Sequence, residues 1–415
     1  MTIRFEKAGR PRVEIMAALE DMRGGDADWK AGRVPLYVFS GPPAVQALGR
    51  DAFNAYFSEN ALGARRAFPS LLQMEHGVVG MGLDLFSAPE GAGNMTSGGT
   101  ESIVMAVKAC RDLNRARRGD ARFRGNLVVP VSAHPAFDKA AALMDLEVRR
   151  VALAEGFVAD PAAMAAAMDD DTMMLVGSVP CFSFGTIDPI GALSALAVAR
   201  GCWLHVDACV GGWMAPFAAD IGRPIPDFDF RLEGVSSLSA DLHKFGFCPK
   251  PASTIFYRSA ALQQAQGFDF DTWPSGRFAT QTLVGTRAGG AVAAAWAVLR
   301  HLGRDGYRDI ARELMALRDA YLDGLGGIEG MRIRGAPALA NIAFGCDDID
   351  MNAVAVLMSE RGWVPGMVRT PASLHLMMSL HHATALEPYV ADVADCVAEV
   401  RRSGGGGPVA EVRYA

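Results

Sequence analysis

Short apolar runs alternate with longer alanine-rich stretches along most of this chain. The runs cover residues 127–131, 173–177, 202–206 and 254–257. Runs this continuous are typical of strands buried on both faces. Apolar residues at helical spacing predict helices over residues 100–115, 161–168, 189–200, 288–302 and 307–325. The alternation predicts βα units around a mostly parallel sheet, which is an α/β fold.

The pattern changes towards both ends of the chain. Residues 1–60 mix charge, glycine and proline with scattered aromatics, which indicates an N-terminal arm, and residues 61–304 form the expected large domain. Strand-like pieces at 339–344 and 374–378, with a helix at 351–361, predict a small α+β C-terminal domain over 305–402. The glycine-rich residues 403–415 predict a flexible tail.

Composition narrows the classes of function. The chain has 415 residues, of which 50% are hydrophobic, and a net charge of −6, so no basic field favours nucleic acid. The arginines between 111 and 124 are interpreted as a solvated helix end and loop. The N-terminus lacks an apolar core of signal-peptide length, and no apolar stretch is long enough to span a bilayer. We therefore expect a cytoplasmic protein without an integral membrane segment.

The cysteines support that compartment. There are seven, at 110, 181, 202, 209, 248, 346 and 396, an odd number without the close spacing of metal ligands. Free thiols in a reducing compartment are the natural interpretation, and no metal site is expected.

Lysine is scarce enough to draw attention to Lys244. Only six of the 40 basic residues are lysines, and Lys139, Lys244 and Lys250 are the candidates for chemistry. Burial beside Phe245 and Phe247 would favour the neutral amine that a Schiff base with an aldehyde cofactor needs. A structural lysine in a loop is the alternative, so other segments must decide.

Three further segments supply the other parts of such a site. Residues 94–103 place Thr96, Ser97 and two glycines before a predicted helix, where backbone N–H groups can bind a phosphate, although a capped helix explains them equally. Asp207 and His134 each follow a predicted strand, at the edge where open α/β sheets bind ligands. A helix cap and a structural histidine are the alternatives for these two.

The order of these residues along the chain favours pyridoxal phosphate. A phosphate cup is followed by a histidine able to stack on a planar ring, a strand-end aspartate and, 37 residues later, Lys244. Anchoring, ring orientation, protonation of the pyridine nitrogen and covalent attachment are the four tasks that this cofactor sets. Together the four signals indicate a pyridoxal-phosphate enzyme.

Four runs of sequence carry a family resemblance. Residues 96–103, 132–141, 205–212 and 239–244 resemble sphingosine-1-phosphate lyases, a branch of the group II pyridoxal-phosphate-dependent decarboxylases, and the resemblance continues through 271–273, 285–290 and 373–375. It implies an aspartate-aminotransferase-like fold (fold type I) with a large domain and a small α+β domain. It also implies a homodimer with shared active sites and a small-molecule amine as substrate.

The resemblance implies a role for each site residue. Lys244 forms the Schiff base, Asp207 contacts the pyridine nitrogen, and His134 stacks on the ring. The residues expected around the cofactor phosphate are Gly98, Gly99, Thr100 and His243, with Gly285 and Thr286 reaching it from the other subunit. Lys250 matches a lysine near the polar end of the substrate, and Tyr37 matches an N-terminal active-site tyrosine.

The chain departs from the lyase pattern at several positions. Gly63 stands where the lyases have histidine, Phe245 and Phe247 where they have tyrosines, and Pro251 where they have glycine. The first three changes would remove an imidazole and two hydroxyls from the pocket wall.

These features leave three hypotheses for function. The leading hypothesis is a carbon–carbon lyase that releases an aldehyde from an amino alcohol or β-hydroxy amine. The alternative is an amino-acid decarboxylase with the same cofactor. A non-catalytic homologue that binds cofactor or a partner is the third hypothesis.

Overall fold

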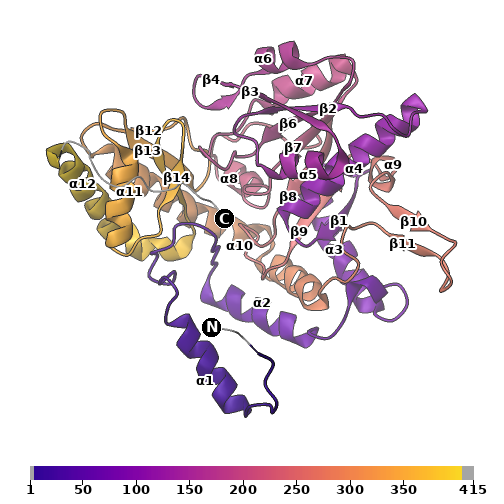
Figure 1. The fold of residues 1–415 in the computed structure, drawn as a ribbon, viewed down its shortest axis with the longest axis horizontal. Helices are drawn as coiled ribbons and strands as arrows, with labels where there is room; N and C mark the ends of the chain where they lie inside the picture. Colours follow the sequence, from indigo (N-terminus) through magenta and orange to yellow (C-terminus); the bar gives the residue numbers. More distant parts are fainter. Residues whose placement is uncertain (1–3, 404–415) are drawn as a thin grey trace.

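The computed structural model describes residues 4–403 of the chain (Figure 1). Of the predicted tail, 403–415, only Ser403 is described, at the end of a helix, and the rest lies outside the described residues.

A seven-stranded sheet forms the centre of the larger part of the molecule. Its strand order is β1-β9-β8-β7-β6-β2-β3, and only β9 runs against the others. The strands are β1 (Ala92–Thr96), β2 (Asn126–Pro130), β3 (Glu147–Val151), β6 (Thr172–Ser178), β7 (Trp203–Asp207), β8 (Val235–Ala240) and β9 (Ser253–Tyr257). The mostly parallel sheet confirms the predicted α/β class.

Alternate residues of the central strands explain why these apolar runs are strands. Leu127 and Val129 join one hydrophobic cluster, with side chains of helices α4 and α5, whereas Val128 between them joins the other. Strand β6 repeats the pattern with Met174 and Leu175. Successive side chains of a strand point to opposite faces, so both faces of this sheet are buried.

Helices cover the sheet and connect its strands. They are α1 (Arg12–Arg23), α2 (Pro43–Ala55), α3 (Pro69–Leu85), α4 (Gly99–Arg118), α5 (Ala136–Met144), α6 (Pro161–Ala167), α7 (Ile190–Arg200), α8 (Ala215–Asp220), α9 (Ala260–Gln264), α10 (Gly289–Gly326), α11 (Met351–Glu360) and α12 (Leu386–Ser403), with 3-10 turns η1 (Ala61–Gly63) and η2 (Leu380–Ala385). The predicted helices at 161–168 and 189–200 differ from α6 and α7 by one residue at an end.

A second, antiparallel sheet lies in the C-terminal part, beside α11 and α12 (Figure 1). Its order is β12-β13-β15-β14, formed by β12 (Met331–Ile333), β13 (Asn341–Cys346), β14 (Gly366–Val368) and β15 (Ser373–Met377). Two small hairpins complete the strands, β4 (Leu153–Ala154) with β5 (Val158–Ala159), and β10 (Phe268–Phe270) with β11 (Phe278–Thr280). The predicted α+β architecture of the C-terminal part is confirmed, while the domain boundaries stay predictions.

Helix α10 joins the two parts of the molecule. The sequence predicts two helices here, and the structure has one element with a break at Gly303, whose φ of 54° and ψ of −169° are not helical. Glycine adopts a positive φ without the steric cost that a side chain brings. The break therefore separates an apolar first half, packed along α2 and α3, from a second half that contacts the small sheet.

The N-terminal segment, which the sequence indicates as an arm, contains helices that the sequence does not predict. It forms two helices, of which α2 packs along α10 and α1 buries none of its residues. Figure 1 shows α1 standing away from the rest of the molecule. Among the described residues, no helix has the length and apolar character needed to cross a membrane.

Candidate active site

The predicted site residues gather at one edge of the large sheet. Thr96, Asp207 and Ala240 are the last residues of β1, β7 and β8, so the segments that follow these parallel strands emerge at the same edge. His134 follows β2 at this edge, and Lys244 follows β8. The fold therefore brings together the four segments that the sequence singles out.

Lys244 forms a buried ion pair. Its Nζ lies 3.0 Å from Oδ2 of Asp241, and the two side chains are 18% and 2% exposed. Burial lowers the pKa of Lys244, but the charge and the hydrogen bond of Asp241, together with smaller contributions from neighbouring groups, raise it above its ordinary value. Burial therefore favours the neutral amine, as the sequence predicts, but in this structure the ion pair with Asp241 keeps Lys244 charged.

Asp207 has one occupied and one available carboxylate oxygen. Oδ1 accepts the backbone N–H of Cys209 at 3.1 Å and the hydroxyl of Ser239 at 3.4 Å. No hydrogen bond from the described residues reaches Oδ2, although Asp207 is only 7% exposed. Oδ2 can therefore accept a hydrogen bond from a ligand, such as the protonated nitrogen of a ring.

His134 lies between this carboxylate and a cavity. Its Nδ1 accepts the backbone N–H of Ala136 at 3.1 Å, which leaves Nε2 as the protonated nitrogen of the neutral ring. Burial lowers the pKa of His134, with Asp207 acting in the opposite direction and Lys244 in the same one. The imidazole is therefore neutral near pH 7, as a ring that stacks on an aromatic cofactor should be.

The start of helix α4 forms the predicted anion site. A Cβ on Gly99 would lie 2.8 Å from Sγ of Cys209 and 2.9 Å from Oδ2 of Asp241, so only glycine fits there. The Glu101 carboxylate accepts the N–H and hydroxyl of Ser97 at 2.6 Å and, through its other oxygen, the N–H groups of Leu283 and Val284 at 2.9 and 3.2 Å. Glu101 thus ties the loop before α4 to the segment around residue 284.

His243 and Lys250 lie beside Lys244. His243 donates from Nδ1 to the carbonyl of Ala252 at 2.7 Å, and its Nε2 lies 3.7 Å from Oδ2 of Asp241. Burial, and then the charge of Lys244, lower the pKa of Lys250. Both residues are therefore coupled to the Lys244 ion pair.

Thr286 lies at a second, smaller cavity of about 70 Å³, which Thr96 and Ser97 of the same chain also line. Asn60 donates to the Thr286 hydroxyl at 3.3 Å, and Gly285 precedes it. Thr100 is exposed in the first turn of α4, next to Gly98 and Gly99. The contribution of Gly285 and Thr286 to another subunit stays a prediction.

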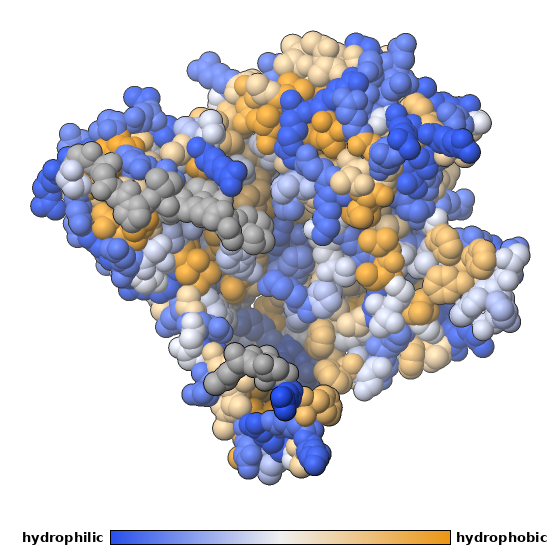
Figure 2. All heavy atoms as spheres, viewed as in Figure 1, coloured by the Kyte–Doolittle hydropathy of each residue, from blue (hydrophilic) through white to orange (hydrophobic). Residues whose placement is uncertain are grey.

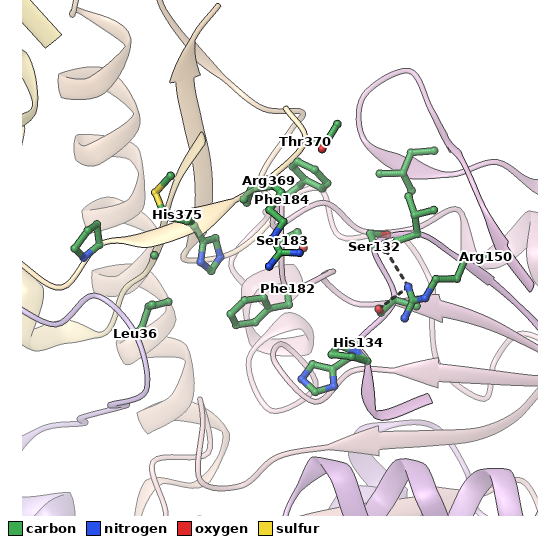
Figure 3. Close-up of a pocket in the computed structure, with 18 of the residues that line it drawn as sticks. Leu36, Ser132, His134, Arg150, Phe182, Ser183, Phe184, Arg369, Thr370 and His375 are labelled. Atoms are coloured by element: carbon green, nitrogen blue, oxygen red, sulfur yellow. Dashed lines mark hydrogen bonds between the residues drawn. The ribbon is translucent and has the colours of Figure 1, made fainter. Parts of the chain in front are cut away.

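A cavity of about 590 Å³ opens beside His134 (Figure 3). His134 and Arg150 come from the large-sheet side, and His375 of β15 comes from the small sheet, as Figure 3 shows. Tyr37, 44% exposed and with a φ of 63°, lines it from the N-terminal segment. The hollow between the two parts of the molecule is visible in Figure 2. The apolar residues Leu36, Leu153, Phe182, Phe184 and Met367 make up much of the wall.

Two of the sequence departures do not shape this cavity. Phe245 is fully buried and meets Phe39 edge-on at 4.9 Å, and Phe247 is 4% exposed in the same core cluster. Neither ring lines either cavity. The prediction that they form a pocket wall is wrong for the described chain, because the turn after Lys244 directs both rings into the core.

Sequence reasoning missed two carboxylates of the site. Asp241 stands three residues before Lys244, a spacing that brings side chains together in a helical turn and could have marked the pair. Glu101 lies in the first turn of α4, where a carboxylate caps backbone N–H groups. Both carboxylates lie within segments that the sequence singles out for other residues.

The residues present fit pyridoxal phosphate. Among the described residues, no hydrogen bond reaches the buried Oδ1 of Asp241 or Oδ2 of Asp207. The glycine at 99 leaves room at the helix N-terminus, where a phosphate is stabilised. Lys244, Asp207, His134 and the Ser97–Thr100 loop would hold the aldehyde, ring nitrogen, ring face and phosphate.

Comparisons with known proteins agree with this geometry. The family described as "Pyridoxal-dependent decarboxylase conserved domain" matches residues 51–346. The sphingosine-1-phosphate lyase of Oryza sativa is 35% identical over 409 residues, 95% of this chain and 75% of the relative. A probable L-tyrosine/L-aspartate decarboxylase of Methanothrix thermoacetophila is 35% identical over 401 residues, 96% of this chain and 99% of the relative.

Solved structures show the same fold. A sphingosine-1-phosphate lyase of Burkholderia pseudomallei has a TM-score of 0.92 at 35% identity, covering 97% of this chain and 94% of that one. A glutamate decarboxylase of Lactobacillus brevis has a TM-score of 0.83 at 18% identity, covering 99% and 96%. The predicted fold and the pyridoxal-phosphate cofactor are confirmed.

Proposed function

The chain belongs to the pyridoxal-dependent decarboxylase family and is a pyridoxal-phosphate-dependent lyase, and we propose that it cleaves a carbon–carbon bond in an amino alcohol or β-hydroxy amine. The bond broken is the one beside the amine-bearing carbon, and an aldehyde leaves. The convergence of Lys244, Asp207 and His134 at one sheet edge, with His134 lining a cavity large enough for an amine substrate, carries the proposal.

Each residue of the chain has one task in this reaction. The bound cofactor supplies an electron sink for the bond beside the amine. Asp207, held by Cys209 and Ser239, would accept from the ring nitrogen through Oδ2, and its negative charge would keep that nitrogen protonated. His134 would hold the ring face, and Lys244 would provide the amine for covalent attachment.

The cavity indicates the kind of substrate. Its wall is largely apolar, with Phe182 and Phe184 on one side and Leu36 on another, which favours a substrate with an extended apolar part. Lys250, next to the Lys244 pair, and Tyr37 would contact the polar end.

A substrate panel tests the proposal. Purified protein is incubated with β-hydroxy amines of increasing chain length and with amino acids, and the products are scored for aldehyde and for carbon dioxide. Aldehyde from at least one β-hydroxy amine is the expected result. Carbon dioxide from an amino acid, without aldehyde, would contradict it and favour the decarboxylase.

Two lysine variants test whether Lys244 binds the cofactor. Lys244→Ala should lose the visible absorption band and all product, whereas Lys139→Ala on α5 should keep both. A Lys244→Ala protein that still forms aldehyde would refute the assigned role. Loss of the band in both variants would point to a folding defect instead.

The decarboxylase remains the second candidate. The Methanothrix relative is as similar in identity as the plant lyase and is covered over 99% of its length. The glutamate decarboxylase shares the fold, but at 18% identity it says nothing about the reaction.

We further propose a cytoplasmic homodimer with shared active sites. Exposed apolar side chains on and near the β10–β11 hairpin, at 268, 270, 273, 283 and 284, support a partner surface (Figure 2). The seven cysteines are all free, as thiols are in a reducing compartment.

A further inference from the structure

A buried row of polar side chains runs across two strands to Asp207. Trp203 Nε1 lies 2.7 Å from the Ser237 hydroxyl, which lies 2.7 Å from Nδ1 of His205. Nε2 of His205 lies 3.2 Å from the Ser239 hydroxyl, which lies 3.4 Å from Oδ1 of Asp207. The strands β7 and β8 supply these residues alternately, since their register places Asp207 opposite Ser239 and His205 opposite Ser237.

The indole fixes the direction of every hydrogen bond in this row. Trp203 can only donate, so the Ser237 oxygen accepts from it. Within the described residues, Nδ1 of His205 is then the one acceptor for the Ser237 proton. Nδ1 therefore carries no hydrogen, and a neutral His205 must hold its proton on Nε2 and donate it to Ser239.

His205 is neutral near pH 7. The ring is fully buried, and burial lowers its pKa to about 4, with the charge of Asp207 acting in the opposite direction. A neutral imidazole has one N–H, so its two nitrogens have opposite roles. The Ser239 oxygen accepts from His205, and from Sγ of Cys209 at 3.2 Å, which leaves its own proton for Asp207.

We propose that Trp203, Ser237, His205 and Ser239 form a one-way donor chain that positions Asp207. The chain ends with a hydroxyl donating to Oδ1, so Oδ2 is the oxygen turned to the cofactor nitrogen. A hydroxyl donor stabilises the charged carboxylate and fixes its rotamer. The inference rests on the proposed role of Asp207, and it makes Trp203 and His205 positioning residues that never touch the cofactor.

A matched pair of serine variants tests the end of the chain. Ser239→Ala removes the last donor, whereas Ser178→Ala removes a hydroxyl without any partner, on the neighbouring strand directly opposite Asp207. We expect the dissociation constant for pyridoxal phosphate to rise about tenfold in Ser239→Ala and to stay unchanged in Ser178→Ala. Equal constants in both variants would overturn the proposal.

A double-mutant cycle tests transmission along the chain. Trp203→Phe keeps a ring against Tyr257, 6.1 Å away, but removes the indole donor. Alone it should weaken cofactor binding about threefold, and in the Ser239→Ala background it should have no further effect. Two effects that multiply would show independent structural damage and contradict the chain.

The proton on His205 gives a readout that needs no cofactor. ¹⁵N spectra of histidine-labelled protein, assigned with His205→Gln, should show the proton on Nε2 in the unsubstituted protein and a mixture in Trp203→Phe. A proton on Nδ1 would overturn the chain even if Ser239→Ala failed to fold. Because this measurement is independent of the reaction, it separates failure of the chain from failure of the proposed function.

Discussion

Asp241 is the strongest attraction that acts on the charge of Lys244. Burial lowers the pKa of Lys244, and the charge and hydrogen bond of Asp241, with smaller contributions from neighbouring groups, together raise it above its ordinary value. Asp207 and His134 could be found from sequence because each follows a strand of recognisable pattern, and Lys244 because lysine is scarce in this chain. Asp241 could not be found in the same way, because its contact with Lys244 depends on the turn that follows β8 and not on the strand itself.

The pair predicts a pH-dependent difference in stability. Asp241→Asn should lower the free energy of unfolding of the cofactor-free protein by about 3 kcal/mol near pH 7, because Lys244 loses the charge that offsets its burial. Burial opposes the charge on Asp241, but Lys244, His243 and Ser253 together outweigh burial and hold the pKa of Asp241 below 3.8, while the pKa of Lys244 is raised above 10.5.

The pair's stabilisation is therefore complete between those ordinary values. It is lost as the pH falls below 3.8 or rises above 10.5. Denaturant unfolding at several pH values measures the difference between the two proteins. A difference that grows towards acid pH would have the wrong sign and would rule out this origin.

Glu101 shows how one side chain joins separate segments. Its two oxygens accept from both the loop before α4 and the segment at 283–284. Glu101→Gln would turn an amide NH₂ towards backbone N–H donors, so we expect cofactor binding to weaken about tenfold. Titration of the cofactor-free protein measures this effect, with Glu90→Gln at an exposed position as the control.

Helix α10 gives a backbone prediction. Gly303→Ala should lower the free energy of unfolding by about 1 kcal/mol, because a φ of 54° strains any residue with a Cβ. Gly80→Ala, inside α3 with open space around its Cβ, should raise it by up to about 1 kcal/mol. Thermal or denaturant unfolding compares them, and a stabilised Gly303→Ala would contradict the observed conformation.

Elements were predictable where one periodicity ran without interruption. The strands β2, β6, β7 and β9 and the helices α6, α7 and α11 were located within two residues because both of their ends carry clear turn signals. The central strand β8 was not predicted, because its serines interrupt the apolar run. The helices α1 and α2 were not predicted, since proline and charge at their ends masked short helical stretches. The break in α10 was anticipated as a gap between two helices but not as a single glycine.

One region of the molecular surface carries exposed apolar side chains that the proposed second subunit would cover. The side chains at 268, 270, 273, 283 and 284 are exposed around the β10–β11 hairpin and the segment that Glu101 holds. We expect Leu283→Asp to shift the protein from dimer to monomer in sedimentation and to lower lyase activity at least tenfold, because charge in an apolar interface is costly.

A surface variant far from this patch is the control. Val198→Asp on α7 replaces a side chain that is 47% exposed and should leave both oligomeric state and activity unchanged. A monomeric Leu283→Asp protein with full activity would show that the sites are not shared. The fold itself could be predicted from alternation of strands and helices, whereas the homodimer is expected only from the family resemblance, because contacts between copies leave no periodic pattern.

The ion pair of Lys244 also protects the amine from other reactions before the cofactor binds. An amine attacks reactive sugars, isocyanates and small carbonyl metabolites only when the amine is unprotonated. An ammonium held 3.0 Å from Asp241 is therefore a poor target for such adventitious damage. In newly made protein, the amine of Lys244 therefore stays unmodified until the aldehyde cofactor binds.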